Sequence, residues 1–251
     1  MALALLLAFL GGLIFGSFLT VVAHRMPRGE SVIGGRSHCP SCGAQIAAYD
    51  NLPVLSWLLL RGRSRCCGEP ISPRYPLTEL TLAILWTATV AVLWADPTEI
   101  ALGLVFTATL LAITLTDLER RVIPNKILLF AAVVGVAIVA VGDPGSLPER
   151  VIAAAAAGGL LFLVVLAYPK GMGLGDVKLT AVMGLYLGRN VAPAVLAALL
   201  MGSLVGLAMI ARQGAAARKQ AIPFGPFLAL GGVVGLLAGD QLVDLYLSTF
   251  S

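Results

Sequence analysis

Long apolar runs dominate this chain of 251 residues and restrict its fold to one class. A helix of about 20 apolar residues can cross the hydrocarbon core of a bilayer. Eight apolar segments are recognisable, at about 2–23, 77–95, 100–116, 127–141, 151–168, 177–187, 191–211 and 224–247. Charged residues make up only 12% of the chain, about half the share usual in soluble domains. The runs are continuous rather than alternating, which disfavours an outer-membrane β-barrel. The sequence therefore predicts an all-α, polytopic membrane helical bundle of about eight segments.

The distribution of Lys and Arg predicts the orientation of these segments. The first run, Met1 to Ala23, has no basic residue before it and no A-x-A-like cleavage site after it, so we expect a retained span rather than a signal peptide. Placing the N-terminus outside puts 15 of the 17 Lys and Arg residues on the cytoplasmic side: 14 in connections 24–76, 117–126, 169–176 and 212–223, and Lys178 just beyond the third of these. A basic face for nucleic acid is disfavoured, because the charges follow the topology.

Two aspartates, Asp117 and Asp176, stand where apolar segments meet polar or Gly-rich turns. A carboxylate at membrane depth is by default a candidate functional group, and two facing carboxyls can share a proton and act as acid and base. Taken singly, each has a structural explanation: Asp117 could pair with Arg120 or Arg121, and Asp176 could cap a helix. Short segments follow both, at 128–141 and 177–187, as expected around a water-filled site. Together these features favour a catalytic pair.

All four cysteines lie in the one sizeable polar region, residues 24–76. On the reducing side of a membrane they favour a metal site over disulfides. The spacing of Cys39 and Cys42 is that of a zinc knuckle. The second half is irregular: the same spacing would put a cysteine at position 64, which is Ser64, and Cys66 precedes Cys67 directly. We expect one structural zinc on these cysteines, with Cys66 as fourth ligand; the alternatives are a spare Cys66 thiol with weak or no zinc, or His38 as a substitute ligand.

The sequence resembles the type IV prepilin peptidases, the bifunctional leader peptidases and N-methyltransferases of bacterial inner membranes. The likeness runs nearly end to end and rests on motifs at 16–19, 24–27, 39–42, 49–53, 55–58, 71–76 with Glu79, and 223–227. The first catalytic motif of the family matches Asp117-Leu118-Glu119-Arg120-Arg121-Val122-Ile123-Pro124-Asn125. Its G-x-G-D signature matches Gly173-Leu174-Gly175-Asp176, extended by Gly171-Met172 and Lys178. Departures are Ser64 for a cysteine and Thr20 for an asparagine.

The resemblance implies an aspartyl peptidase that cleaves prepilins or pseudopilins of type IV pili or type II secretion at the cytoplasmic surface of the inner membrane. Asp117 and Asp176 would be catalytic, and Gly173 and Gly175 would lie near the substrate, where the absence of Cβ lets an extended chain approach. It also implies N-methylation with S-adenosylmethionine, associated with residues 1–76, while 77–251 would form the peptidase. No nucleotide-binding glycine motif follows a strand, so this second activity rests on resemblance alone.

Other functions remain open from the residues alone. Intramembrane carboxylates, short helices and Gly-rich turns also suit a proton-coupled small transporter, although the first and last four segments show no repeat. A binding or assembly protein is a third possibility, and a peptidase without methyltransferase activity a fourth, because Ser64 departs from the regular cysteine pattern.

Overall fold

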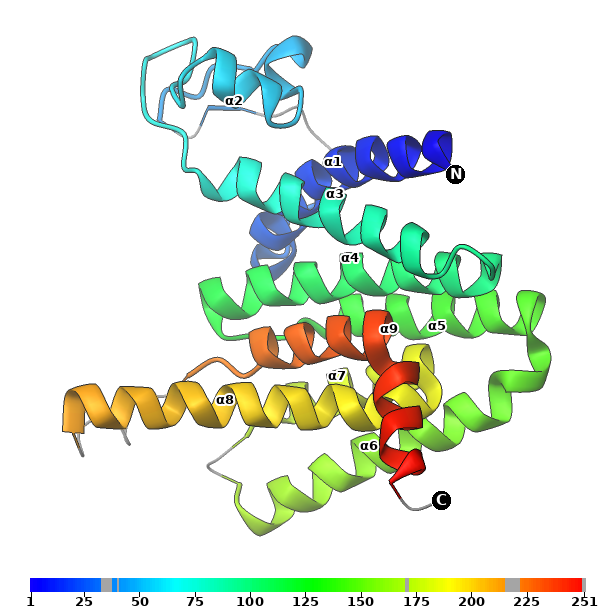
Figure 1. Ribbon diagram of the computed structural model, residues 1–251. Coiled ribbons are helices and arrows are strands. Elements are labelled where there is room, and N and C mark those ends of the chain that lie inside the picture. Colours follow the sequence, from blue (N-terminus) through cyan, green and yellow to red (C-terminus); the bar gives the residue numbers. More distant parts are fainter. Residues whose placement is uncertain (33–37, 40, 170–171, 215–221, 250–251) are drawn as a thin grey trace. The chain divides into compact units, whose positions relative to one another are not determined.

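The computed structural model describes residues 1–32, 38–39, 41–169, 172–214 and 222–249. The chain divides into two compact units, Met1–Val92 and Leu93–Ser251 (Figure 1). Within the described residues the regular structure is helical, and pairing between extended segments is limited to two isolated bridges in the polar region. This agrees with the predicted all-α class.

The first unit is a pair of long helices joined by the polar region. Helices α1 (Ala2–Arg25) and α3 (Arg74–Val92) pack side by side (Figure 1). The polar region contains the short helices η1 (Met26–Arg28), η2 (Ala48–Asn51) and α2 (Leu55–Leu59). A Cβ atom at Gly16 would lie 2.6 Å from the Cα atom of Glu79. Glycine on α1 therefore permits a backbone approach that any larger residue would prevent.

The second unit contains six longer helices: α4 (Pro97–Arg120), α5 (Asn125–Gly142), α6 (Leu147–Ala167), α7 (Leu174–Leu187), α8 (Val191–Gln213) and α9 (Gly225–Ser248). Two 3₁₀ turns connect them, η3 (Pro144–Ser146) and η4 (Gly188–Asn190). The shortest of the six, α7, contacts each of the other five. Neighbouring helices thus bury most of its 14 residues, whereas Leu174 and Lys178 are exposed.

The core of the second unit forms around α7. Tyr186 is fully buried, its ring stacks on Phe106 of α4 with centroids 5.1 Å apart, and its hydroxyl donates to the carbonyl oxygen of Ala131 on α5 at 2.7 Å. Leu179 and Met183 of α7 are also inaccessible to solvent. A buried tyrosine with a satisfied hydroxyl fixes the register of α7 against two helices at once.

Seven stretches of described helix are long and apolar enough to cross a membrane. One of them, Leu174–Gln213, comprises α7, η4 and α8, so each of the eight apolar segments expected from the sequence coincides with a separate helix. The expectation that 128–141 forms an unusually short segment was wrong: α5 begins at Asn125, directly after Pro124, and has 18 residues. The second short segment is real, but it starts at Leu174 rather than Val177.

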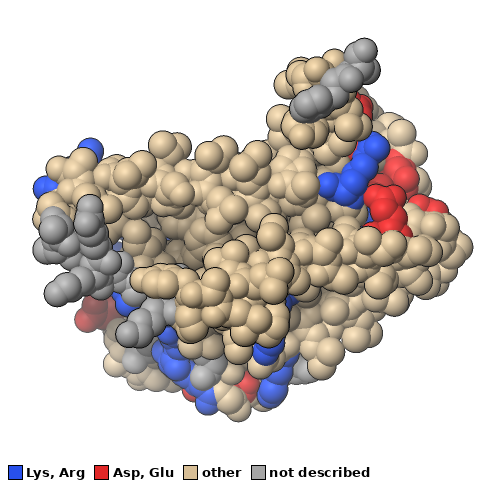
Figure 2. Space-filling model, turned by 90° about the horizontal axis from the view of Figure 1, so that it is seen from below, with Lys and Arg blue, Asp and Glu red and all other residues tan. Residues whose placement is uncertain are grey.

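The surface is that of a membrane protein. Large apolar side chains are exposed along the long helices, among them Leu129 and Phe130 on α5, Ile152 on α6 and Leu204 on α8. Figure 2 shows a face that is mostly tan, with acidic and basic residues lying near one another in a few places toward its margin. Such a surface would be an aggregation hazard in water and is the ordinary exterior of a helix bundle in lipid.

Candidate functional site

Asp117 lies in the last turn of α4, and its carboxylate is bound to the start of α9. The residue is 6% exposed, and Oδ2 accepts a hydrogen bond from the backbone N–H of Gly225 at 3.0 Å. Arg121 ends the helix in the left-handed conformation, with φ of 55°. Within the described residues no direct ion pair joins Asp117 to Arg120 or Arg121, and the direct partner of its carboxylate is the Gly225 N–H.

Asp176 is the third residue of α7 and is 8% exposed. Its Oδ2 accepts a hydrogen bond from the backbone N–H of Gly173 at 3.1 Å, which completes a capping arrangement at the start of the helix. The capping role foreseen for this residue is therefore present. It engages one of the two carboxylate oxygens and does not compete with a second role for the same group.

The structure brings the two aspartates into one region of the second unit. Helix α4 contacts α7, and Gly175, next to Asp176, packs against Ile123 in the turn that follows α4. Both are buried, and each is oriented by the backbone N–H of a glycine. Two like charges held close together in such surroundings would repel each other, and a shared proton would relieve that repulsion. The arrangement has the elements needed for paired acid and base chemistry.

The two glycines of the G-x-G-D signature have different structural roles. Gly173 is the residue that caps α7. A Cβ atom at Gly175 would lie 3.1 Å from Cβ of Ile123, in the turn that follows α4. Gly175 therefore permits close packing between the two aspartate motifs. Proximity of either glycine to a substrate stays a prediction, and Gly171 lies outside the described residues.

Two further residues of this region had no assigned role in the sequence. The first is Gly225, which orients Asp117; the signal for it was the matching segment 223–227. The second is Lys178, whose Nζ donates to Oδ1 of Asn125 at 3.0 Å. This bond joins the residue two positions after Asp176 to the end of the first aspartate motif. The motifs are thus tied together by contacts that their spacing along the chain does not reveal.

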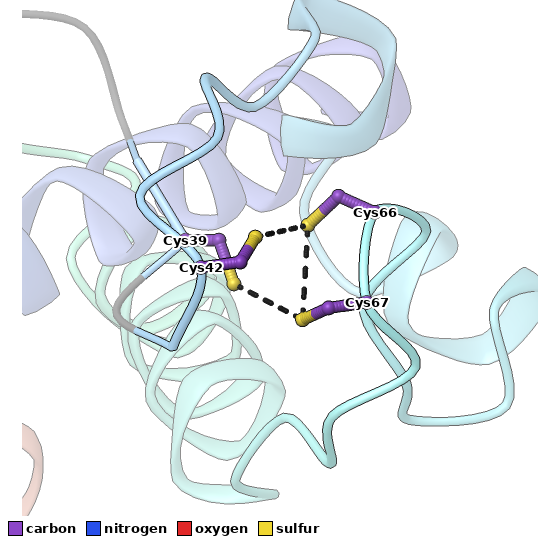
Figure 3. Close-up of side chains that lie close together, drawn as sticks. All are labelled: Cys39, Cys42, Cys66 and Cys67. Carbon is purple, nitrogen blue, oxygen red and sulfur yellow. Dashed lines mark hydrogen bonds between the residues drawn. The ribbon is translucent and has the colours of Figure 1, made fainter.

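The four cysteine sulfurs converge in the polar region of the first unit (Figure 3). Sγ of Cys39 lies 3.6 Å from that of Cys67, Sγ of Cys42 lies 3.3 Å from that of Cys66, and the sulfurs of Cys66 and Cys67 lie 3.9 Å apart. All four sulfurs fall within 4.8 Å of one another. Tetrahedral zinc with Zn–S bonds of about 2.3 Å separates its sulfurs by about 3.8 Å. The spacing suits a zinc site with four cysteine ligands, and His38 is outside the cluster.

The two halves of this cluster share one backbone geometry, 25 residues apart. An isolated bridge pairs His38 with Gln45 in the first half and Arg63 with Pro70 in the second. In the first half the backbone N–H of Cys39 donates to the carbonyl oxygen of Ala44 at 2.8 Å. In the second half the N–H of Ser64 donates to the carbonyl oxygen of Glu69 at the same distance. The glycines that close the turns, Gly43 and Gly68, have φ of 70° and 72°.

This repeat explains the irregular cysteine spacing. Ser64 occupies the position of Cys39, Cys67 that of Cys42, and Cys66 that of Ser41. The fourth sulfur therefore comes from the middle of the second turn instead of its beginning. The hydroxyl of Ser64 stays in the site as a hydrogen-bond partner of Cys67, with Oγ 3.1 Å from Sγ.

The first turn already favours an ionised ligand. The pKa of the Cys39 thiol is lowered to about 6, because the backbone N–H groups of Cys42 and Ser41 donate to its sulfur. A metal binds the thiolate rather than the thiol. The turn thus lowers the cost of deprotonating one ligand before a metal arrives.

The cluster is attached to the motif around residue 50. Arg65, next to Cys66, makes a two-pronged ion pair with Asp50 through Nε and Nη2, and its guanidinium lies 5.5 Å from the ring centre of Tyr49. Glu79, at the start of α3, also joins this region, because its Oε2 accepts the N–H of Val54 at 2.7 Å. Val54 has a φ of 61°, unusual for a β-branched residue, and this bond helps to hold it.

Comparisons with known proteins agree along the whole chain. The profile of the bacterial peptidase A24 N-terminal domain matches residues 10–93, and that of the type IV leader peptidase family matches residues 104–210. A prepilin leader peptidase/N-methyltransferase of Aeromonas hydrophila is 37% identical over 274 aligned residues, covering 97% of this chain and 94% of the relative. One of Bacillus subtilis is 35% identical and covers 95% of this chain and 96% of the relative. No solved structure matches the chain significantly.

Proposed function

Because the chain belongs to the type IV leader peptidase family, we propose that it is a membrane-embedded aspartyl endopeptidase that removes the leader from type IV prepilins or pseudopilins. The observation that carries the proposal is the pairing of Asp117 and Asp176 in one buried region, each bound to a glycine N–H. The names of the relatives support the substrate class.

The proposed reaction uses the two carboxyls as one unit. The ionised carboxylate takes a proton from water, and the resulting hydroxide equivalent adds to the scissile carbonyl carbon. The protonated carboxyl donates a hydrogen bond to the carbonyl oxygen as charge develops there. Collapse of the tetrahedral intermediate breaks the C–N bond, and the carboxyl pair donates to the leaving amine the proton that it took from water, which regenerates the starting state. The pair shares its proton, so neither aspartate is assigned one state.

We propose that the protein lies in the inner membrane of a bacterial cell and that its site opens toward the cytoplasm. Asp117 lies at the end of α4 that is followed by Arg120 and Arg121, and Asp176 lies at the start of α7. The excess of Lys and Arg in the connections at this end supports the assignment under the positive-inside rule.

Substitution of either aspartate tests the proposal. Detergent-purified protein would be incubated with a prepilin-like peptide and the products identified by mass spectrometry. We expect Asp117→Asn and Asp176→Asn to abolish cleavage, because an amide cannot exchange the proton. The double variant should be about as inactive as either single one, since the residues act together. Asp244→Asn, an exposed acid on α9, is the matched control and should cleave normally. Near-full turnover by a folded Asp117→Asn protein would refute the pair.

The second proposed activity is methylation of the amine that cleavage exposes. The methyl group would pass from the sulfonium of S-adenosylmethionine to the nitrogen, which loses a proton. Support comes from the names of the relatives and from the match of the first unit to a separate family profile. We propose that the zinc-bound polar region supports this step, because its residues are distinct from the aspartate pair.

Scoring both products of one peptide separates the two activities. Cys42→Ser combined with Cys67→Ser should lower methylation more than cleavage, because hydrolysis needs only the carboxyls and water. Equal loss of both would show that the polar region also positions the substrate. Cleavage without methylation by the unaltered protein would identify a peptidase without the transferase activity.

A further inference from the structure

An open groove of about 420 Å³ lies between α5 and α7, and the proposed chemistry does not use it. Six residues line it: Asn125, Lys126, Leu128, Leu129, Lys178 and Val182. Lys178 follows Asp176 by two positions on α7 and therefore lies on a different face of that helix, and neither aspartate lines the groove. Asn125, Lys126 and Lys178 line one part, the cationic end. Leu128, Leu129 and Val182 line the rest, the apolar length.

The cationic end is built by the starts of two helices. Asn125 and Lys126 are the first residues of α5, and Lys178 lies one turn into α7. The bond from Nζ of Lys178 to Oδ1 of Asn125 holds one ammonium group at this end. Helix α5 also directs the positive end of its dipole here, because its first two residues line the groove. None of the described lining residues is acidic. The end of the groove therefore favours an anion.

The apolar length runs along two of the membrane helices. Leu128 and Val182 form its buried floor, with exposures of 4% and 8%, whereas Leu129 is 67% exposed beside them. Both α5 and α7 belong to stretches long and apolar enough to cross a membrane. An exposed leucine at that depth contacts lipid rather than water.

We propose that this groove binds an anionic membrane phospholipid. One acyl chain would lie along Leu128, Leu129 and Val182, and the phosphate would contact Lys126 and Lys178. The charge of the headgroup selects the class of lipid. A headgroup that carries its own ammonium would meet two lysines and the N-terminus of α5. An uncharged glycerol headgroup leaves the phosphate charge uncompensated until it binds. The competing occupant is an apolar segment of the peptide substrate.

Native mass spectrometry of the full chain in detergent tests the selectivity. The probes are phosphatidylglycerol and phosphatidylcholine with the same acyl chains, added in equal amounts. We expect phosphatidylglycerol to be retained preferentially, with roughly a fivefold loss of that preference for each lysine removed. Lys126→Gln combined with Lys178→Gln should remove most of it. Arg212→Gln, an exposed cation near the end of α8 and outside the groove, should not.

Further variants keep the proposal open to refutation. Leu129→Trp should fill the apolar length and reduce retention of both lipids. Lys126→Gln alone gives the charge test if the double variant fails to fold. Equal retention of the two lipids by the unaltered chain, or undiminished preference in folded lysine variants, would overturn the proposal. So would a photo-crosslinker at position 129 that captures a prepilin-like peptide in place of phosphatidylglycerol in vesicles containing both. None of these measurements depends on peptide cleavage.

Discussion

The carboxylate of Asp117 accepts its hydrogen bond from the backbone of Gly225, 108 residues further along the chain. A Cβ atom at Gly225 would lie 2.6 Å from Oδ2 of that carboxylate, well inside van der Waals contact. The start of α9 can therefore approach the end of α4 this closely only because residue 225 has no side chain.

This fit predicts that Gly225→Ala displaces the Asp117 carboxylate. Displacement of a catalytic group by about 1 Å can lower turnover roughly 100-fold, and we expect a loss of that order in kcat while the protein stays folded. Cleavage of a prepilin-like peptide measures the loss, with circular dichroism as the check on folding. Gly206→Ala on α8 is the matched control, because its Cβ would meet nothing within 4 Å. Equal activity of the two variants would contradict the positioning role.

The repeated turn of the cysteine cluster predicts a rescue. Cys66→Ser should lower bound zinc well below one ion per chain, because it removes the fourth sulfur. Adding Ser64→Cys should restore binding, because residue 64 occupies in the second turn the position of Cys39 in the first.

Metal analysis of purified protein measures the zinc, and cobalt substitution reports the number of thiolate ligands by absorption. Failure of the double variant to regain metal, with the rest of the chain folded, would show that the two turns are not equivalent as ligand carriers. Full zinc in Cys66→Ser alone would show that Cys66 is not a ligand.

The orientation of the chain predicts which residues can be labelled from outside the cell. In a variant whose native cysteines are replaced by serine, a cysteine at Gly145, before α6, should react with an impermeant maleimide on intact cells. A cysteine at Glu30, after α1, should react only after the membrane is opened. Both positions are exposed in the structure. The reverse pattern would put the aspartate pair on the opposite side from the one proposed.

Arg150 is predicted to contribute strongly to stability. It is 7% exposed, pairs with Glu99 of α4, and donates from Nη1 to the carbonyl oxygen of Tyr186 at 2.5 Å. We expect Arg150→Leu to cost about 2–3 kcal/mol of unfolding free energy, somewhat less than for a fully buried pair, because the side chain of Glu99 is 30% exposed. Thermal unfolding in detergent measures the loss.

The exposed pair between Arg189 and Asp240 supplies the comparison. Its side chains are 56% and 62% exposed, so Arg189→Leu should cost at most about 1 kcal/mol. Equal destabilisation by the two substitutions would mean that burial does not set the contribution of Arg150.

The sequence predicted the parts of this molecule that depend on local pattern. Apolar runs of sufficient length predicted the helices, because no other regular structure satisfies the backbone in lipid. The polar region was recognised from its cysteines, and the structure brings their sulfurs together, including that of Cys66. The start of α5 was misjudged because Asn125 and Lys126 are polar, although Pro124 before them is a common helix-start signal.

The contacts that join distant segments could not be predicted in the same way. Nothing in the spacing of residues indicates that Gly225 meets Asp117, or that Gly175 packs on Ile123. The shared geometry of the two cysteine turns was likewise hidden, because it is carried by backbone hydrogen bonds while the side chains at Cys39 and Ser64 differ. Such features depend on tertiary packing, which neither hydropathy nor sequence motifs describe.

The enclosure of α7 has a consequence for membranes of different thickness. Lipid-exposed helices respond to a thicker or thinner bilayer by tilting, and α6 and α8 expose enough apolar surface to do so. By contrast, α7 is packed against five neighbours; Gly175 near its start packs against Ile123, and Tyr186 near its end bonds to Ala131. The depth of Asp176 is therefore set by protein contacts rather than by acyl-chain length. A cell that remodels its lipids as temperature changes would leave the separation of the two aspartates unaltered.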